Sequence, residues 1–217
     1  MPKNYGMTEE AYTPDSLVAG DKVITKNGTL LTGENRARGA LLGKITLGAV
    51  SETHAGNTGN GVLTPDAATP ILANAQAGVY KAACIAAAVN GGTFRVSDPK
   101  GNVLGDVAVG VAFANQIKFV IADGAADFIV GDTFLITVAP GSLKYKLSAA
   151  AAVDGSQVPD SILVEATDAT AADIDVGLYV GGEFNENAIT FGAGHTADSV
   201  RDALRDKGII LKKGVPA

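Results

Sequence analysis

The sequence has one cysteine, no tryptophan and only 6% aromatic residues, and each shortage excludes a class of protein. A single cysteine cannot build an intramolecular disulfide framework or a cysteine-based zinc cluster. No apolar run approaches the length of about 18 residues that a transmembrane helix needs, so we expect no membrane partner. Acidic residues (23) outnumber lysine and arginine (17), and the net charge of −6 argues against a nucleic-acid partner.

Signatures of catalysis are also missing. The two histidines, His54 and His195, stand far apart, and no nucleophile, zinc or phosphate-loop motif accompanies them. Cys84 lies in an apolar run and is predicted to be a buried core thiol. Asp168, Asp173 and Asp175 lie close together but lack the spacing of a calcium loop, which favours a solvated acidic loop. We therefore predict no catalytic residue, no cofactor and no metal site.

The residues that are abundant, 27 glycines among 47% hydrophobic residues, favour a folded, strand-rich protein. Asn27-Gly28 between two short apolar runs predicts a β-hairpin, because a type I′ turn needs positive φ at both positions. A Gly/Asn/Thr-rich connector is predicted over residues 51–61. Short apolar runs separated by turns then predict a β-sandwich or barrel. These runs cover residues 79–87, 93–96, 103–111, 117–121 and 133–138.

One helix is predicted over residues 196–207. Thr196 can cap its first turn, and Gly208 can end it in the left-handed conformation. The opening segment, residues 1–16, is polar and has no periodicity, so we expect a flexible arm. The missing hydrophobic leader after Met1 favours synthesis in a cytoplasm.

Several short motifs resemble the lambda-type head decoration proteins of tailed bacteriophages. Their order and spacing carry the resemblance, which covers residues 17–50 and 142–213. The motifs are Ala19-Gly20-Asp21, Arg38 to Thr46, Asp154-Gly155-Ser156, Ser161-Ile162-Leu163, Gly182 to Asn187, Arg201-x-Ala203-Leu204 and Gly208 to Leu211.

The resemblance implies an α+β, predominantly β fold: a decoration-protein body with one C-terminal helix, interrupted by an inserted β-sandwich or barrel-like domain. A compact relative would have only a short connection where this chain carries roughly 90 further residues. We expect three parts: a flexible arm over residues 1–16, a discontinuous body over 17–50 and 142–217, and an inserted β domain over 51–141.

The function implied by the resemblance is non-enzymatic decoration of a phage head. Such proteins dock on the outer surface of the mature capsid as trimers at threefold positions, so the partners are the major capsid protein and two further copies of the chain. By the same resemblance the virion is the final location, after synthesis in the host cytoplasm. The arm would contact the shell through Pro2, Tyr5, Met7, Tyr12, Leu17 and Val18.

Phe184, Asn185, Ile189 and Phe191 are candidates for the interface between subunits, which in a ring of three joins two different patches. The equal alternative is that Phe184, Ile189 and Phe191 are core residues of one subunit. Two other functions stay open: a carbohydrate- or surface-binding β module, and another virion subunit such as a tail or minor shell protein. A sugar site needs exposed aromatic platforms, whereas alternation predicts that most aromatic residues of the inserted domain point inward.

Overall fold

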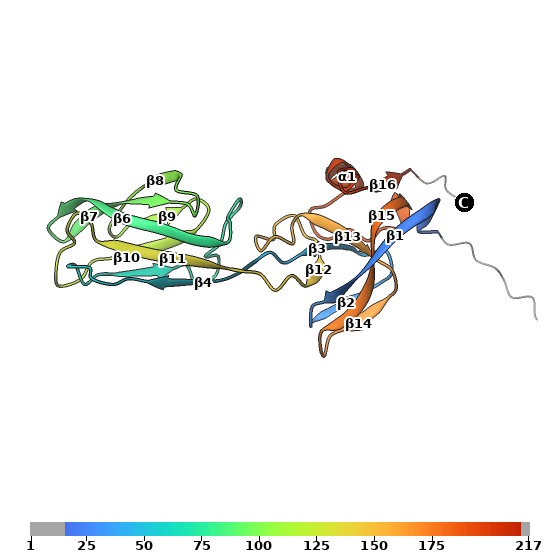
Figure 1. Cartoon of the computed structure of the whole chain (residues 1–217), viewed down its shortest axis with the longest axis horizontal. Helices are drawn as coiled ribbons and strands as arrows, with labels where there is room; N and C mark the ends of the chain where they lie inside the picture. Colours follow the sequence, from blue (N-terminus) through green and yellow to red (C-terminus); the bar gives the residue numbers. More distant parts are fainter. Residues whose placement is uncertain (1–15, 214–217) are drawn as a thin grey trace, which may run out of the picture.

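The chain folds into two lobes that lie end to end along the long axis of the molecule (Figure 1). The computed structural model describes residues 16–213. One lobe, which we call the body, is built from residues 16–44 and 145–213. The other lobe, which we call the sandwich, is built from residues 47–140. The sandwich therefore interrupts the body in sequence and stands beside it in space.

The body contains a six-stranded sheet in the order β1-β12-β3-β13-β15-β16. β1 also pairs with β15, so five strands close into a ring and β16 lies outside it. The β1–β12 and β15–β16 pairs are parallel, and the remaining pairs are antiparallel. The strands are β1 (Val18–Leu30), β3 (Leu41–Lys44), β12 (Tyr145–Leu147), β13 (Pro159–Leu163), β15 (Ile174–Asn185) and β16 (Ile209–Lys212).

Smaller elements complete the body. β2 (Glu34–Arg36) and β14 (Thr167–Ala169) form a separate antiparallel pair, and a short 3-10 helix η1 (Glu186–Ala188) follows β15. The α-helix α1 (Ala197–Arg205) packs beside β16, and its apolar face joins a core with β15 and β16. The buried members of this core are Leu17, Leu41, Ile162, Tyr179, Phe184, Ile189, Val200, Leu204, Ile209 and Leu211.

The predicted C-terminal helix is confirmed, including both of its end signals. The Thr196 hydroxyl accepts a hydrogen bond from the Ser199 backbone N–H (3.2 Å), and the Thr196 N–H donates to the Ser199 hydroxyl (2.9 Å). This reciprocal pair satisfies donors that the first helical turn leaves without partners. Gly208 has φ +83° just beyond the helix, where a side chain would be strained.

The sandwich consists of two antiparallel sheets around one apolar core. Along β11 the side chains of Phe134, Ile136 and Val138 are buried while Leu135 faces outward, the alternation expected of a strand that covers a core. The larger sheet has the order β4 (Leu47–Thr53), β11 (Thr133–Pro140), β6 (Gly78–Ala88), β7 (Gly91–Ser97), β8 (Val103–Ala108). The smaller sheet has the order β5 (Val62–Pro65), β10 (Lys118–Ala122), β9 (Ala112–Ala114).

The fold class is the predicted one, a predominantly β protein with one α-helix among the described residues. Boundaries differ in detail. β4 begins at Leu47, so the expected domain boundary at residue 51 falls inside a strand, and the predicted connector 51–61 contributes its first three residues to β4. Autonomous folding of the inserted region is still a prediction.

The predicted Asn27-Gly28 hairpin is wrong, because both residues lie within the continuous strand β1. Neither of them has positive φ. Gly28 is needed for close packing instead: a Cβ there would lie 2.4 Å from Leu178 Cδ1 and 2.9 Å from Tyr145 Cε2. The glycine that indicated a turn therefore lets β1 approach its neighbours across the ring.

Two antiparallel chain segments join the lobes. Lys44 at the end of β3 is paired with Tyr145 at the start of β12. Beyond this pair, the Ile45 N–H donates to the Lys144 carbonyl and the Gly141 N–H donates to the Thr46 carbonyl, both at 2.9 Å. The sandwich thus stands where a compact body would need only the turn of a β-hairpin between β3 and β12.

Candidate docking surfaces

The described chain begins at the end of the body that lies farthest from the sandwich (Figure 1). Asn185 at the end of β15 holds this starting point with two hydrogen bonds. Its side-chain amide donates to the Ser16 carbonyl (3.1 Å), and its backbone N–H donates to the Leu17 carbonyl (2.9 Å). Val18 then pairs with Phe184. We call this point the arm root, because the predicted arm precedes it.

The residues predicted to contact a shell are distributed on both sides of the arm root. Leu17 is 2% exposed and belongs to the body core, an environment that does not favour its predicted contact with the shell. Val18 is half-buried and packs against the same core. An apolar side chain next to the β15–β16–α1 core gains more from burial than from exposure. The other members of the predicted set, Pro2, Tyr5, Met7 and Tyr12, lie outside the described residues.

The candidate interface residues gather in the core of the single chain. Phe184 is fully buried and Ile189 is buried, both in the cluster that contains Leu17. Phe191 is half-buried and packs against that cluster, and Asn185 fixes the arm root. Phe184 is in contact with Tyr179, with ring centroids 5.1 Å apart. These environments match the alternative that the phenylalanines are core residues of one subunit.

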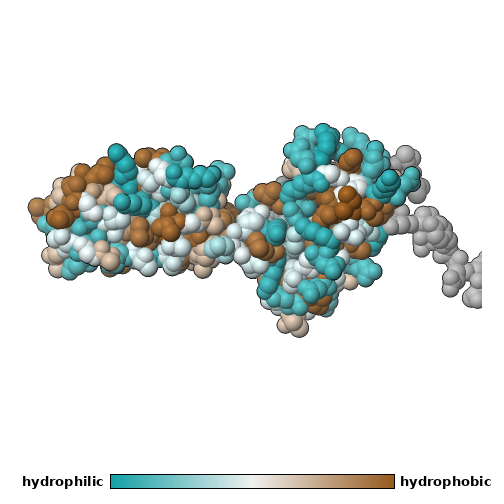
Figure 2. Space-filling model, viewed as in Figure 1, coloured by the Kyte–Doolittle hydropathy of each residue, from teal (hydrophilic) through white to brown (hydrophobic). Residues whose placement is uncertain are grey.

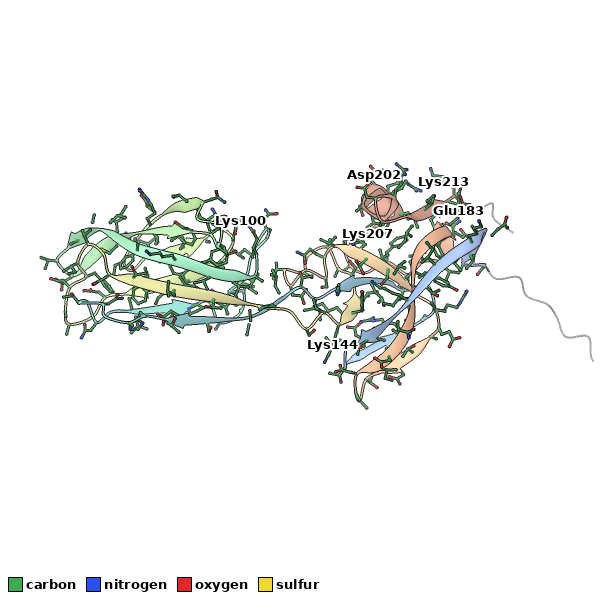
Figure 3. The ribbon with its side chains drawn as sticks, viewed as in Figure 1. Lys100, Lys144, Glu183, Asp202, Lys207 and Lys213 are labelled. Atoms are coloured by element: carbon green, nitrogen blue, oxygen red, sulfur yellow. The ribbon has the colours of Figure 1, made fainter. Side chains whose placement is uncertain are left out.

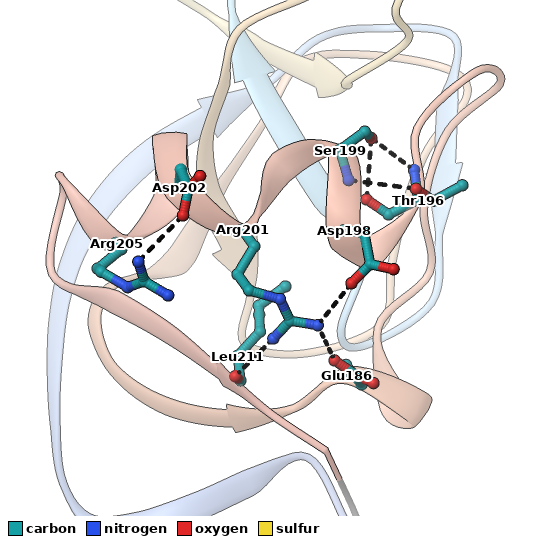
Figure 4. A network of polar contacts seen from close by, with 8 residues as sticks. All are labelled: Glu186, Thr196, Asp198, Ser199, Arg201, Asp202, Arg205 and Leu211. Carbon is teal, nitrogen blue, oxygen red and sulfur yellow. Dashed lines mark hydrogen bonds and ion pairs between the residues drawn. The ribbon is translucent and has the colours of Figure 1, made fainter.

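Arg201 ties α1 to the strands beside the arm root (Figure 4). Its guanidinium donates to Glu186 Oε2 (2.6 Å), to Asp198 Oδ1 (3.1 Å) and to the backbone carbonyl of Leu211 (2.9 Å). The hydrogen bonds that Arg201 donates to the Glu186 and Asp198 carboxylates raise the pKa of its guanidinium above the ordinary value. One side chain thus links α1, η1 and β16, and the carbonyl that it occupies lies on the outermost strand of the sheet.

An exposed stretch of β1 adjoins the arm root. Residues 21–27 are all exposed, although they form a strand that pairs with β15 along one edge. Val23 is 40% and Ile24 is 64% exposed, and Ile210 on β16 is 38% exposed. Figure 2 shows hydrophobic atoms over this end of the body, and Lys213 lies there as well (Figure 3). The sequence interpretation missed this surface because it placed a hairpin turn within it.

The aromatic residues of the sandwich are all buried, and none is more than 6% exposed. Several contact one another, such as Phe94 and Phe128 with ring centroids 5.0 Å apart. The inward orientation inferred from alternation is therefore confirmed. The aromatic side chains of the sandwich therefore offer no exposed platform for a sugar ring. These residues are Tyr80, Phe94, Phe113, Phe119, Phe128 and Phe134.

The reactive side chains are engaged in the fold. Cys84 is 2% exposed, and burial raises the pKa of its thiol. His54 Nδ1 lies 2.8 Å from Glu52 Oε1, and its ring makes a T-shaped contact with the Phe134 ring. His195 Nε2 lies 3.2 Å from the hydroxyl of Ser148, but that hydroxyl is fully buried and donates to a backbone carbonyl. A serine in this position cannot reach a substrate.

The three aspartates predicted to form a solvated acidic loop are exposed, but Asp168 lies in β14 and Asp175 lies in β15, so they do not share one loop. Two of the three bind other parts of the body. Asp173 accepts a hydrogen bond from the Thr32 N–H (2.8 Å) and forms an ion pair with Lys144. These two contacts lower the pKa of Asp173, the lysine being the larger influence. Asp175 binds the Thr29 hydroxyl (2.8 Å), and Asp168 binds within its own turn. Between residues 16 and 213 no group of three or more potential ligand side chains is placed to hold a metal ion.

A family model described as bacteriophage lambda head decoration protein D matches residues 6–209. The chain belongs to this family. The match spans the body and the sandwich together, and it starts within the segment predicted to be the arm. Head decoration proteins are structural proteins of the phage virion that associate with the capsid, so membership places the chain in that setting.

The other comparisons give little information beyond the match to the head decoration family. No curated protein matches the chain. Two crystal structures of Xanthomonas campestris FlgL are similar over 48% and 46% of this chain, at 21% and 22% sequence identity. Their TM-scores are 0.32 and 0.31, and the chain spans about a third of the FlgL chain, 33% and 31%. No helix within residues 16–213 is both long enough and apolar enough to cross a membrane.

Proposed function

We propose that this head decoration protein binds the outer surface of the mature phage head as a trimer at threefold positions and stabilises the shell without catalysis. The observation that carries the proposal is the family match over residues 6–209. In this proposal the major capsid protein is the partner, and the arm before residue 16 supplies the contact. An arm that pairs with a shell strand gains backbone hydrogen bonds that must exceed the entropy of ordering it.

The position of the arm root supports an orientation in which the end of the body away from the sandwich faces the shell. Asn185 fixes the chain at Ser16 and Leu17, on the end of the body away from the sandwich. Tension on a docked arm would therefore be transmitted into the core around Phe184. The exposed stretch of β1 lies next to the arm root and would also face the shell. With this end on the shell, the sandwich projects outward from the particle.

The sandwich does not favour the carbohydrate-binding alternative, because its aromatic residues are buried. A tail or minor shell role is left as the second candidate among virion proteins, and it predicts a different position on the particle. Electron microscopy of decorated particles distinguishes the two: density at threefold positions on the head supports decoration, and density confined to the tail contradicts it.

A pelleting assay with undecorated heads tests the arm. We expect removal of residues 2–15 to leave the fold intact and to weaken head binding, because Ser16 and Leu17 keep their contacts with Asn185. Binding through backbone pairing should fall only modestly as salt rises. Heads incubated with the shortened chain should also open at a lower temperature than heads decorated with the full chain.

The matched control keeps residues 2–15 in scrambled order, which preserves length, charge and composition. If the arm acts by sequence-specific pairing, the scrambled chain should bind as weakly as the shortened one. Equal binding by all three chains would contradict the arm as the contact and would move the contact to the folded body. Sedimentation of the free protein and image analysis of the particle test the trimer separately.

A further inference from the structure

The loop between β12 and β13 belongs to the body but reaches the sandwich. It covers residues 148–158, and we call it the brace. Val153, near its middle, packs against the core of the sandwich. The backbone carbonyl of Asp154 accepts hydrogen bonds from the Thr46 N–H (2.8 Å) and the Leu47 N–H (2.9 Å), where the chain passes from β3 into β4. The brace is therefore a third attachment between the lobes, beside the two chain segments of the junction.

Buried hydrogen bonds hold the brace on the body. Ser148 and Ser156 are fully buried, and the Ser148 hydroxyl donates to the Ser156 carbonyl (2.8 Å). The Ser148 N–H donates to the carbonyl of Leu41 on β3 (2.9 Å). The Asp154 carboxylate accepts a hydrogen bond from the Ser156 hydroxyl (2.6 Å) and pairs with Lys146 of β12 (2.6 Å). Since buried hydrogen bonds are costly to leave unmade, the brace is held to the body more firmly than a solvated loop.

Gly155 allows the brace to approach the junction closely. Its φ is +98°, and a Cβ at this position would lie 2.9 Å from the Thr46 nitrogen and would overlap the Thr46 hydroxyl. Glycine suits both the conformation and the contact. Gly33, in another turn of the body, has a similar φ of +89°, but a Cβ there would have no neighbour within 4 Å. The two glycines thus share a backbone conformation and differ in whether a side chain would meet the junction.

Away from the brace the lobes have little to hold them at a fixed angle. Among the described residues no strand of one lobe pairs with a strand of the other. Beside the brace a cleft of about 420 Å³ lies between the lobes, and its lining includes Asn74 and Ala75 of the sandwich and Gln157 and Val158 of the brace. Lobes joined by a small contact are expected to move relative to each other. Whether they do so here therefore depends on the brace.

We propose that the brace locks the sandwich at one angle to the body, so that the two lobes move as a single rigid unit. The two antiparallel segments of the junction form a narrow ribbon, and a hinge between lobes needs no more than a few such residues. The brace opposes bending of this ribbon. For the sandwich to swing, Val153 would have to leave the sandwich core, and the Asp154 carbonyl would lose its two hydrogen bonds.

This rigidity is a property of the free chain and does not depend on head binding. It has a consequence for a chain that docks as proposed above. The direction in which each sandwich projects is then set by how the body sits on the shell, because the junction adds no freedom of its own.

Pulsed electron paramagnetic resonance between spin labels on the two lobes of the full chain tests the brace. Ile24→Cys places a label on the body, and Val103→Cys places one on the sandwich, both at exposed positions. Cys84 is buried, so the chain without these substitutions is the labelling blank. Val89→Cys with Val103→Cys, a pair within the sandwich, gives the reference width. We expect one distance distribution between the lobes, as narrow as the reference, and a broad or double-peaked distribution would overturn the proposal.

Two substitutions that loosen the brace are the second measurement. Gly155→Ala pushes the brace away from Thr46, and Val153→Ser removes the apolar contact with the sandwich core. Each should at least double the width of the distance distribution between the lobes, whereas Gly33→Ala, the matched control, should leave it unchanged. Val153→Ser introduces no steric overlap, so it keeps the test decisive if Gly155→Ala does not fold. An unchanged width in Val153→Ser, or equal broadening in Gly33→Ala, would overturn the proposal.

Discussion

At the scale of single residues, Asp132 shows how a polar side chain organises a segment that has no hydrophobic pattern. Its carboxylate accepts hydrogen bonds from the backbone N–H groups of Thr58 (2.9 Å), Gly59 (2.9 Å) and Ile129 (3.1 Å). Burial alone would raise the pKa of Asp132, but these donors outweigh it and lower the pKa. One aspartate thus fixes part of the glycine-rich loop after β4 against the loop before β11.

Asp132→Asn should destabilise the sandwich by about 1–3 kcal/mol, because an amide supplies one acceptor oxygen where the carboxylate supplies two. The folded-state pKa of Asp132 is below its unfolded value. Its stabilisation is therefore complete above an unfolded pKa of about 4 and is lost as pH falls through the folded pKa. Urea unfolding at neutral and acidic pH should show the difference between the two proteins shrinking with acid.

The exposed Asp202→Asn on α1 is the control for this pH series, since its carboxylate is in a surface pair with Arg205. Surface pairs contribute little to stability. A penalty for Asp132→Asn that is the same at both pH values would show that the carboxylate charge is not what holds the loop.

Phe184→Ala distinguishes the two roles considered for the phenylalanines at the end of β15, a subunit interface and the core of one subunit. Phe184 is fully buried, so its loss should cost about 3–5 kcal/mol of unfolding free energy through the cavity left behind. Ile24→Ala, at an exposed position of β1, should change stability by less than about 0.5 kcal/mol. Thermal melting and sedimentation together distinguish the core role of Phe184 from an interface role. An unchanged melting temperature with loss of the oligomer would favour the interface.

At the scale of elements, the sequence predicts features that depend on neighbouring residues better than features that depend on distant contacts. The ends of α1 depend on Thr196 and Gly208, which act within a few residues, and both were predictable from the sequence. The apolar runs of the sandwich likewise indicated most of its strands. Gly28 indicated a turn, but its role is set by Leu178 and Tyr145, which are distant in sequence. The burial of Leu17 was missed for the same reason, since its partners come from β15, β16 and α1.

Two neighbouring substitutions test the corrected path of β1. Asn27→Ala should change stability by less than about 0.5 kcal/mol, because residue 27 is an exposed strand position without positive φ. Gly28→Ala should cost about 1–3 kcal/mol, since its methyl group overlaps Leu178 and Tyr145. A type I′ turn would make both positions sensitive. Urea unfolding of the two variants therefore separates strand from turn.

At the scale of the whole molecule, the sandwich occupies the place of one hairpin turn. Lys44 and Tyr145 are paired residues of β3 and β12, so their backbones are already close enough to be joined by two residues. This register gives sharper cut points than the composition change near residues 51 and 141 could indicate. It also explains why a long insertion leaves the ring of body strands continuous.

Replacing residues 45–144 by Asn-Gly should give a soluble chain that unfolds cooperatively, because every strand of the body sheet is retained. Val153 packs on the sandwich core and becomes exposed, so the same chain with Val153→Ser serves as its companion. Circular dichroism during urea titration measures the cooperativity of unfolding. The slope of the unfolding free energy against urea concentration should be smaller than in the full chain, because less surface is buried. Aggregation of both chains with several turn sequences would show that the body depends on the sandwich.

The two chain segments at the junction also decide how the molecule carries load. A pull on the outer end of the sandwich reaches the body through β4 and β11, which continue into β3 and β12 side by side. The force divides between two segments of the same backbone, and the hydrogen bonds that join these segments are perpendicular to the force. Within the body the load then acts along β3 against β13, so the hydrogen bonds between these two strands must slip together before β3 leaves. A lobe joined through such a junction is anchored by shear rather than by peeling.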